Sequence, residues 1–173
     1  TQFTATQAAD ALNYLALAGY DADKAAEVLP SVLSLAAAGG MDLAYASDLV
    51  TDAMASLQIE ATKSNVDDFG NKLAMAASKA NANVSQLGEA ILTVGGTAAN
   101  LKGGTTELTT ALGLLANVGI KGAEGGTHLR NIILSLQSPT DEAATKMEKL
   151  GLSVYDAQGN MRGLDEILGD LNT

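Results

Sequence analysis

The sequence lacks cysteine and tryptophan, and it has only two prolines, two phenylalanines and one histidine among 173 residues. A chain without cysteine has no disulfide framework, no thiolate metal ligand and no cysteine nucleophile. Aromatic residues make up 3% of the chain, and alanine and leucine supply most of its apolar residues. These side chains suit closely packed helices better than a β-sandwich or a barrel, so we expect an all-α fold.

Basic residues are also scarce. Ten Lys and Arg residues stand against twenty Asp and Glu residues, which gives a net charge of −10. Because nucleic-acid binding depends mostly on Lys and Arg, nucleic acid is not an expected partner, and an anionic membrane surface is disfavoured for the same reason. The uncharged stretch Leu108–Ile120 is much shorter than the roughly 20 residues that cross a bilayer, so no stable membrane span is expected.

Helical spacing of apolar residues dominates residues 1–151, which we interpret as a helical core of about eight packed helices. Residues 122–136 form one of these helices, and Pro30 is expected to kink or restart another. The predicted N-cap residues are Thr4 or Thr6, Asp21, Asp42, Asn65 or Asp67, Ser85, Thr105 or Thr106, and Thr140. The predicted stops, where glycine can adopt the left-handed conformation, are Gly19, Gly39-Gly40, Gly119 and Gly151.

Residues 152–173 change character. Val154–Asp156 and Met161–Arg162 flank the turn signal Gly159-Asn160, which predicts a small β-hairpin. Leu164–Leu171 then begins a helix that the end of the chain truncates. Since the chain also opens with a residue other than Met, we expect it to be a fragment of a longer protein.

An isolated two-stranded hairpin is only marginally stable in water. We therefore expect Val154 or Tyr155 to pack against the helix that begins near Thr140, with Leu150 and Leu152 between them.

Part of the sequence is echoed at an offset of 100 residues. Thr6, Ala11, Leu12, Leu15, Ala16, Gly19 and Leu29 recur as Thr106, Ala111, Leu112, Leu115, Ala116, Gly119 and Leu129. One interpretation is an internal repeat of a helical hairpin. The other is two ordinary hairpins in a chain rich in alanine and leucine.

Few residues could carry chemistry. His128 has Glu124 one helical turn before it but no evident nucleophile, so a structural histidine is the favoured interpretation. The acidic pairs are expected at helix starts, where they favour the positive end of the helix dipole. These pairs are Asp67-Asp68, Asp141-Glu142 and Asp165-Glu166.

Two short motifs resemble ligand-binding loops, one a phosphate-binding loop and the other a calcium-binding loop. Gly122–Thr127 is rich in glycine but lacks the preceding strand and the Lys-Ser/Thr ending of a P-loop, which favours tight helix packing. Asp156–Asn160 has too few acids for a calcium loop. We therefore expect no catalytic residue, no cofactor-binding residue, no metal ligand and no enzymatic activity.

Four segments, in this order and spacing, resemble the core region of phage tail tape measure proteins. They are Ala11–Asp21; Leu29–Ala38 with Asp42–Ala44 and Asp48–Asp52; Leu115–Gly122 leading into Gly126–Asn131; and Val154–Arg162. The resemblance covers about residues 5 to 171. The chain departs from the family at His128, where a small residue is usual, and at Gly163, where proline is common.

The resemblance implies a structural role in a phage or prophage tail. Members of this family lie in the tail lumen and set tail length, and tube and assembly-chaperone proteins gather on them in the host cytoplasm. The expected partners are therefore tail-tube proteins, tail assembly chaperones and the remainder of the full-length chain, and self-association is a further expectation. The chain lacks sustained heptads, so it would be a globular core of such a protein rather than its extended ruler.

Two alternatives remain open at this stage. Some family members carry a peptidoglycan-cleaving domain, so one alternative is a cell-wall hydrolase domain of a phage tail protein. The other is a helical adaptor domain without a role in phages.

Overall fold

The computed structural model describes residues 3–172. These residues form nine α-helices and one short 3-10 helix, and no strand forms among them, so the all-α prediction is confirmed. The helices are α1 (Ala5–Leu17), α2 (Ala22–Gly39), α3 (Leu43–Ser56), α4 (Lys63–Lys79), α5 (Val84–Val94), η1 (Gly95–Ala98), α6 (Gly104–Asn117), α7 (Gly122–Gln137), α8 (Asp141–Lys149) and α9 (Leu164–Leu171).

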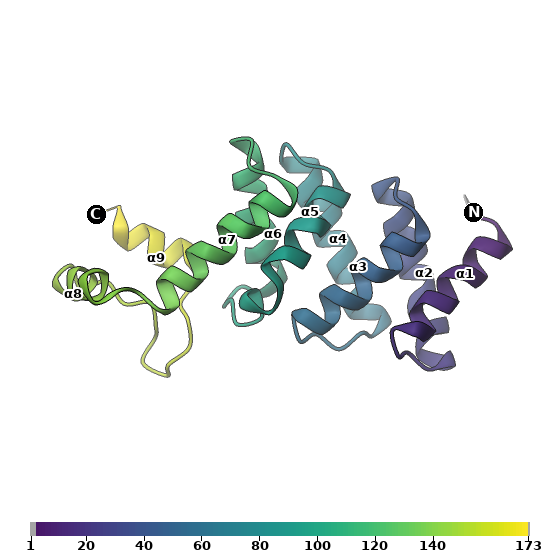
Figure 1. Ribbon diagram of the computed structural model, residues 1–173, viewed down its shortest axis with the longest axis horizontal. Coiled ribbons are helices and arrows are strands. Elements are labelled where there is room, and N and C mark those ends of the chain that lie inside the picture. The colour runs from purple at the N-terminus through teal and green to yellow at the C-terminus, as the bar shows by residue number, and fades with distance from the viewer. Residues whose placement is uncertain (1–2, 173) are drawn as a thin grey trace.

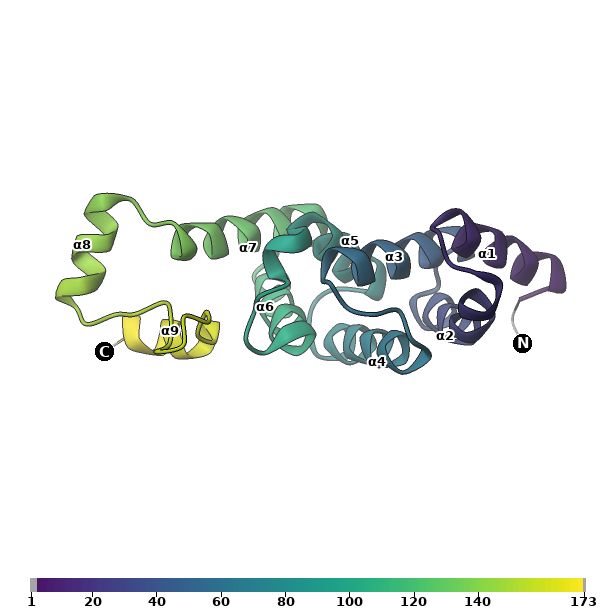
Figure 2. The same cartoon turned by 90° about the horizontal axis from the view of Figure 1, so that it is seen from below.

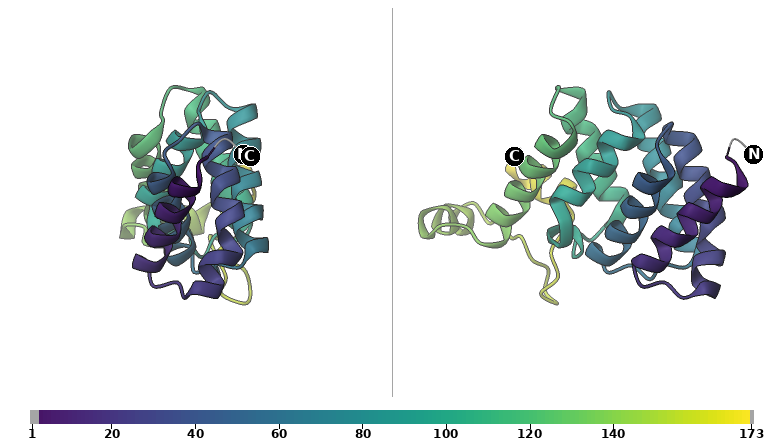
Figure 3. Two further views of the ribbon diagram at one scale, coloured as in Figure 1. Left: turned by 90° about the vertical axis from the view of Figure 1, so that its right-hand side faces the viewer. Right: turned by 45° about the vertical axis from the view of Figure 1, so that its right-hand side comes forward.

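The first seven α-helices are arranged in two rows (Figure 1). Helices α1, α3, α5 and α7 succeed one another in one row, and α2, α4 and α6 lie in the other (Figure 2). Each helix packs on its row neighbour and on its partner in the other row. Seen from the N-terminal end, α1 and α2 lie side by side at the front of the array (Figure 3).

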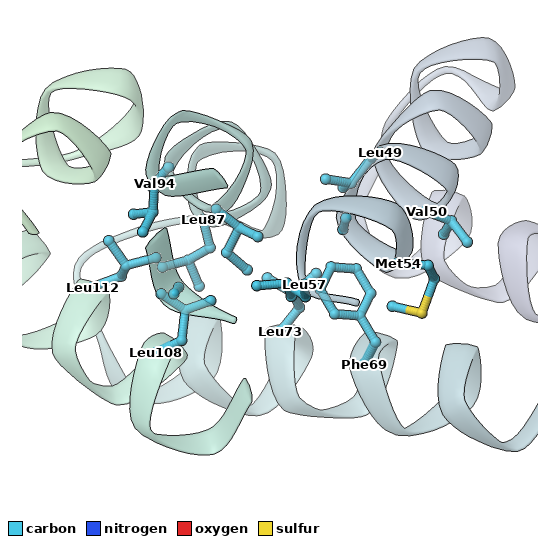
Figure 4. Close-up of a cluster of buried hydrophobic side chains, with 14 of the residues drawn as sticks. Leu49, Val50, Met54, Leu57, Phe69, Leu73, Leu87, Val94, Leu108 and Leu112 are labelled. Carbon is cyan, nitrogen blue, oxygen red and sulfur yellow. The ribbon is translucent and has the colours of Figure 1, made fainter. Parts of the chain in front are cut away.

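The core lies between the two rows. Figure 4 shows leucines and one phenylalanine that meet there from both rows: Leu49 from α3, Phe69 and Leu73 from α4, Leu87 from α5, and Leu108 and Leu112 from α6. All six side chains are almost fully buried. Alanines on the same faces, such as Ala46 and Ala53, let the helices approach closely.

Four predicted N-caps are confirmed. Thr4 forms a capping box with Gln7, and the side chains of Asp21, Asp42 and Thr140 accept hydrogen bonds from the first turns of α2, α3 and α8. Gly19, Gly40, Gly119 and Gly151 adopt positive φ directly after α1, α2, α6 and α8, as predicted.

Three other helix starts were predicted wrongly. Helix α4 begins earlier, at a cap formed by Thr62, whose side chain accepts the Asn65 N–H at 3.2 Å. The Glu27 carboxylate of α2 also accepts the Lys63 N–H, at 2.9 Å. Helix α5 is capped by Asn83, which forms a reciprocal box with Gln86. Helix α6 begins at Gly104, and the Glu107 carboxylate accepts the Gly103 N–H at 2.8 Å instead of a threonine cap.

Pro30 does not restart a helix. It lies inside α2, which continues from Ala22 to Gly39. Val28 before the proline and Val32 and Leu35 after it are buried on one side of α2, so both halves are held by the same packing. That packing offsets the loss of the proline's backbone hydrogen bond.

The predicted β-hairpin is wrong. Tyr155 and Met161 form a single antiparallel bridge, and within residues 3–172 this pairing does not extend into strands. The Asp156 carboxylate accepts the N–H groups of Gln158 and Asn160, both at 2.9 Å, and the Asp156 N–H donates to the Asn160 carbonyl at 2.9 Å, so side-chain and backbone bonds together close a tight turn. The residues left on each side are too few for a stable ladder.

The expected packing of this segment is correct only in part. Val154 and Leu152 are buried, but Leu150 is exposed, and α8 has no buried residue. The Tyr155 hydroxyl donates to the Gln137 carbonyl at 3.4 Å, so the segment reaches the end of α7. Met147 of α8 packs, partly buried, against the cluster that contains Leu152 and Val154. The predicted boundary between a helical core and a C-terminal segment near residue 151 stays a prediction. The buried cluster continues past this boundary to Leu164 and Ile167 of α9.

The echoed segments end their first helices alike. Gly19 and Gly119 have φ of 90° and 94°, and the N–H groups of Tyr20 and Ile120 donate to the carbonyls of Leu15 and Leu115. However, α1 and α6 lie in opposite rows of the array. The internal repeat therefore stays a prediction supported by turn geometry, not by equivalent positions.

No helix within residues 3–172 is by itself long and apolar enough to cross a membrane. Helices α2 and α3 pass that test only as a pair, and the chain bends by 116° between them.

Candidate functional site: a groove between α6, α7 and α9

The structure places His128 on the surface of α7. Its Nε2 lies 3.9 Å from the Glu124 Oε1, and both side chains are more than half exposed. A general base needs a partner that holds it and a nucleophile within reach. His128 and Glu124 lie one helical turn apart, and their side chains meet on the protein surface.

Two of the three acidic pairs lie where the sequence predicts them, in the first turns of α8 and α9. Asp67 and Asp68 do not, because α4 begins at Lys63 and leaves them in its second turn. Their carboxylates instead pair with Lys63 and Lys72 along the helix. The hydrogen bond from Lys63 lowers the pKa of Asp67.

The glycine-rich motif of α7 serves close packing. A Cβ at Gly126 would lie 2.4 Å from the Ala90 carbonyl oxygen and 2.6 Å from the Thr93 Cβ, both in α5. Helices α5 and α7 make the most extensive contact between any two elements of residues 3–172. The interpretation as tight helix packing is confirmed.

Asp156 is engaged by the backbone of its own turn. The N–H group of Asn160 and then that of Gln158 lower the pKa of its carboxyl. Within the part of the chain that the structure describes, no three His, Cys, Asp or Glu side chains lie together as metal ligands would. The candidates considered from the sequence are thus not brought into one site.

A polar cluster joins the N-terminus of α6 to α9. The Glu107 carboxylate accepts the N–H groups of Gly103 and Leu164, and so links the starts of the two helices. Lys102 pairs with Glu166 at 2.6 Å, which lowers the pKa of Glu166 and raises that of Lys102. Arg162 pairs with Glu166 and also with Asp170, at 2.7 Å.

This cluster closes one end of an apolar groove of about 770 Å³. The groove lies between α6 and α9 and is bounded by α7, with Ala111, Leu115, Leu129 and Leu164 along its walls. Two leucines at its edges, Leu114 and Leu168, are 65% and 55% exposed. A smaller groove of about 330 Å³ follows the other side of α6 against α4 and shares Leu114.

Sequence reasoning missed both the groove and the cluster. The one available signal was Leu114, which falls between the buried positions Leu112 and Ala116 and so points off the buried stripe of α6. No sequence signal placed Glu107 beside Leu164, because that contact joins residues far apart in the chain.

The fold is thus an array of short helices in two stacked rows. The chain matches the family described as phage-related minor tail protein over residues 1–173. It belongs to that family.

Two relatives extend the comparison. The chain is 34% identical over its whole length to the tape measure protein of Pneumococcus phage Dp-1 and covers 15% of that protein. It is 28% identical over 171 residues, 99% of its length, to the probable tape measure protein of Escherichia phage P2 and covers 21% of that protein. The chain thus spans about a fifth or less of these relatives. No solved structure matches it.

Proposed function

We propose that the chain is a structural module of a tail tape measure protein that acts in tail assembly and in setting tail length. The observation that carries the proposal is the match over all 173 residues to a tape measure protein at 34% identity. The family match over the same residues supports it.

The architecture supports a globular role within such a protein. Seven helices pack side by side in two rows, and their shared core makes a compact block. An extended ruler would instead show one long helix or a sustained heptad repeat. This block would take part in assembly, while the length of the ruler would come from other parts of the protein.

The proposed location is the lumen of the virion tail, which the chain would reach after assembly in the host cytoplasm. The proposed partners are tail-tube proteins, assembly chaperones and the remainder of the full-length chain. Its net charge of −10 would repel DNA, which suits a part that leaves the tube and does not hold its cargo.

We propose no enzymatic activity. A glycoside hydrolase needs two carboxyl groups on either side of the bond that it cleaves. Of the three carboxylates that line the groove, Glu107 accepts backbone N–H groups and Glu166 pairs with Lys102, which leaves Asp165 without a second available carboxylate. The walls are aliphatic, and they lack the aromatic surface on which sugars stack.

The proposal is tested by an in-frame deletion of residues 1–173 from the gene of a phage that carries this chain, followed by electron microscopy. We expect a strong loss of assembled tails, and the matched point variant Gly70→Ala should leave tail yield and length normal. Normal tails after the deletion would contradict the proposal. Tails shortened by about 260 Å, the length of 173 residues of helix, would show that the segment is part of the ruler instead.

A further inference from the structure

The groove interrupts the packing of the array. Helices α2 and α4, and then α4 and α6, pack directly on one another in their row. Helix α9 lies next in the same row (Figure 2), but it makes little direct contact with α6. The opening between α6 and α9 is the apolar groove, and α7 forms its third side.

Exposed aliphatic side chains gather at this opening. Leu114 of α6, Ile132 of α7 and Leu168 of α9 all line the groove, and each is more than two-fifths exposed. Because all three line the same groove, these side chains are gathered at one place rather than scattered singly over the surface. A partner that covers these three side chains would remove them from water.

The shape of the groove suits a helix. Thr106, Thr110 and Leu114 follow one another along its α6 wall at intervals of four residues. They span two turns, or about 12 Å. A partner helix lying along this wall would insert side chains spaced three and four residues apart between α6 and α9, as in other helix-in-groove complexes.

The charge at the polar end of the groove selects the partner. The charged residues that line the groove are Glu107, Asp165 and Glu166 against Lys102. Arg162 and Asp170 belong to the same ion-pair cluster, so four acidic groups stand against two basic ones at this end. The chain as a whole carries −10. An acidic surface attracts a basic partner and repels a second copy of itself.

We propose that this groove binds an amphipathic helix of another protein, whose apolar face carries leucine-like side chains and whose flanks carry Lys or Arg. The apolar face covers Leu114, Ile132 and Leu168, and the basic flank lies beside Asp165. This inference goes beyond the tail role and does not depend on it, because it stands on the groove and its charge.

The test uses a synthetic 14-residue peptide of leucine and lysine only, with leucines at helical spacing, titrated into the chain at low ionic strength. A peptide of the same pattern with glutamate in place of lysine is the charge control. A scrambled leucine and lysine peptide is the shape control. We expect binding of the basic helix at least tenfold tighter than binding of either control.

Variants at the groove locate the binding. The double variant Leu114→Ala with Leu168→Ala should weaken binding at least tenfold, whereas Leu17→Ala, at a 77% exposed leucine of α1, should change it less than twofold. Asp165→Asn should weaken binding at low salt but not at high salt, because salt screens exposed charges. The matched variant Asp23→Asn, in the first turn of α2, should have no such effect.

Three outcomes would overturn the proposal. The first is equal binding by the acidic or the scrambled peptide. The second is unchanged binding by the double variant, with its helicity and melting temperature shown to be normal. The third is dimerisation of the wild-type chain that the double variant abolishes, since the groove would then hold a second copy of the chain.

Discussion

The crossing of α5 and α7 can be tested by a single methyl group. Gly126 faces the Ala90 carbonyl and the Thr93 Cβ, and a Cβ added there would lie 2.4 Å and 2.6 Å from these atoms. Neither atom is the end of a flexible side chain, so no rotamer change relieves the contact. Gly126→Ala therefore forces the two helices apart by about 1 Å to restore ordinary van der Waals separation.

The magnitude follows from two opposing terms. Overpacking of a tight core contact costs roughly 1–3 kcal/mol, and the extent of the α5–α7 contact places this case at the upper end. Alanine offsets about 1 kcal/mol of that loss, because it is a better helix former than glycine. The net loss of about 2 kcal/mol corresponds to a fall in melting temperature of about 4–8 °C for a chain of this size.

The matched control is Gly70→Ala in the middle of α4. A Cβ at Gly70 would meet only Leu35, at 3.7 Å, which is ordinary contact. This variant should be more stable than the wild type by up to about 1 kcal/mol. Thermal and denaturant unfolding, followed by circular dichroism, measure both variants. If Gly126→Ala is stabilised as much as Gly70→Ala, the reasoning about the crossing is refuted.

Three further predictions concern other parts of the chain. Gly119→Val should lower stability by about 1–3 kcal/mol, because φ there is 94° and a β-branched residue is strained in that region; an unchanged melting temperature would refute it. Deleting residues 152–173 should keep most helicity but promote association, because it removes buried apolar side chains such as Leu152, Val154 and Ile167 from the cluster that they share with the other helices; sedimentation should show the association, and a monomer with an unchanged melting temperature would contradict it. Because Lys102 lowers the pKa of Glu166 in the folded chain, their pairing stabilises above the unfolded pKa of glutamate, about 4.3, and is lost as the pH falls through the lower folded value. Unfolding of Glu166→Gln should therefore show a smaller loss of stability than the wild type between pH 5 and pH 3 at low salt, and identical acid profiles would contradict the assignment.

Helices could be predicted where the signal is local. Thr4 and Asp21 cap helices with their own side chains, and Gly119 ends a helix by its own conformation. Each of these features depends on residues within about four positions. The all-α class followed from composition for the same reason, because alanine and leucine favour helices at every position.

Features set by distant residues could not be predicted in this way. The start of α9 has no cap from its own side chains, and the Leu164 N–H donates instead to Glu107 in α6, 57 positions away. Pro30 remains inside a helix because packing on both sides of it outweighs its local preference. The groove exists because α9 lies beside α6 and makes little direct contact with it apart from the polar cluster at their starts. The hydrophobic periodicity of either helix does not indicate this spacing.

The central claim, that the chain is a structural part of a phage tail, is tested most directly by quantitative mass spectrometry of purified particles before and after DNA release. We expect peptides from residues 1–173 in intact tails and their loss from tails that have released their DNA. The absence of these peptides from intact tails, or their full retention after DNA release, would contradict the account.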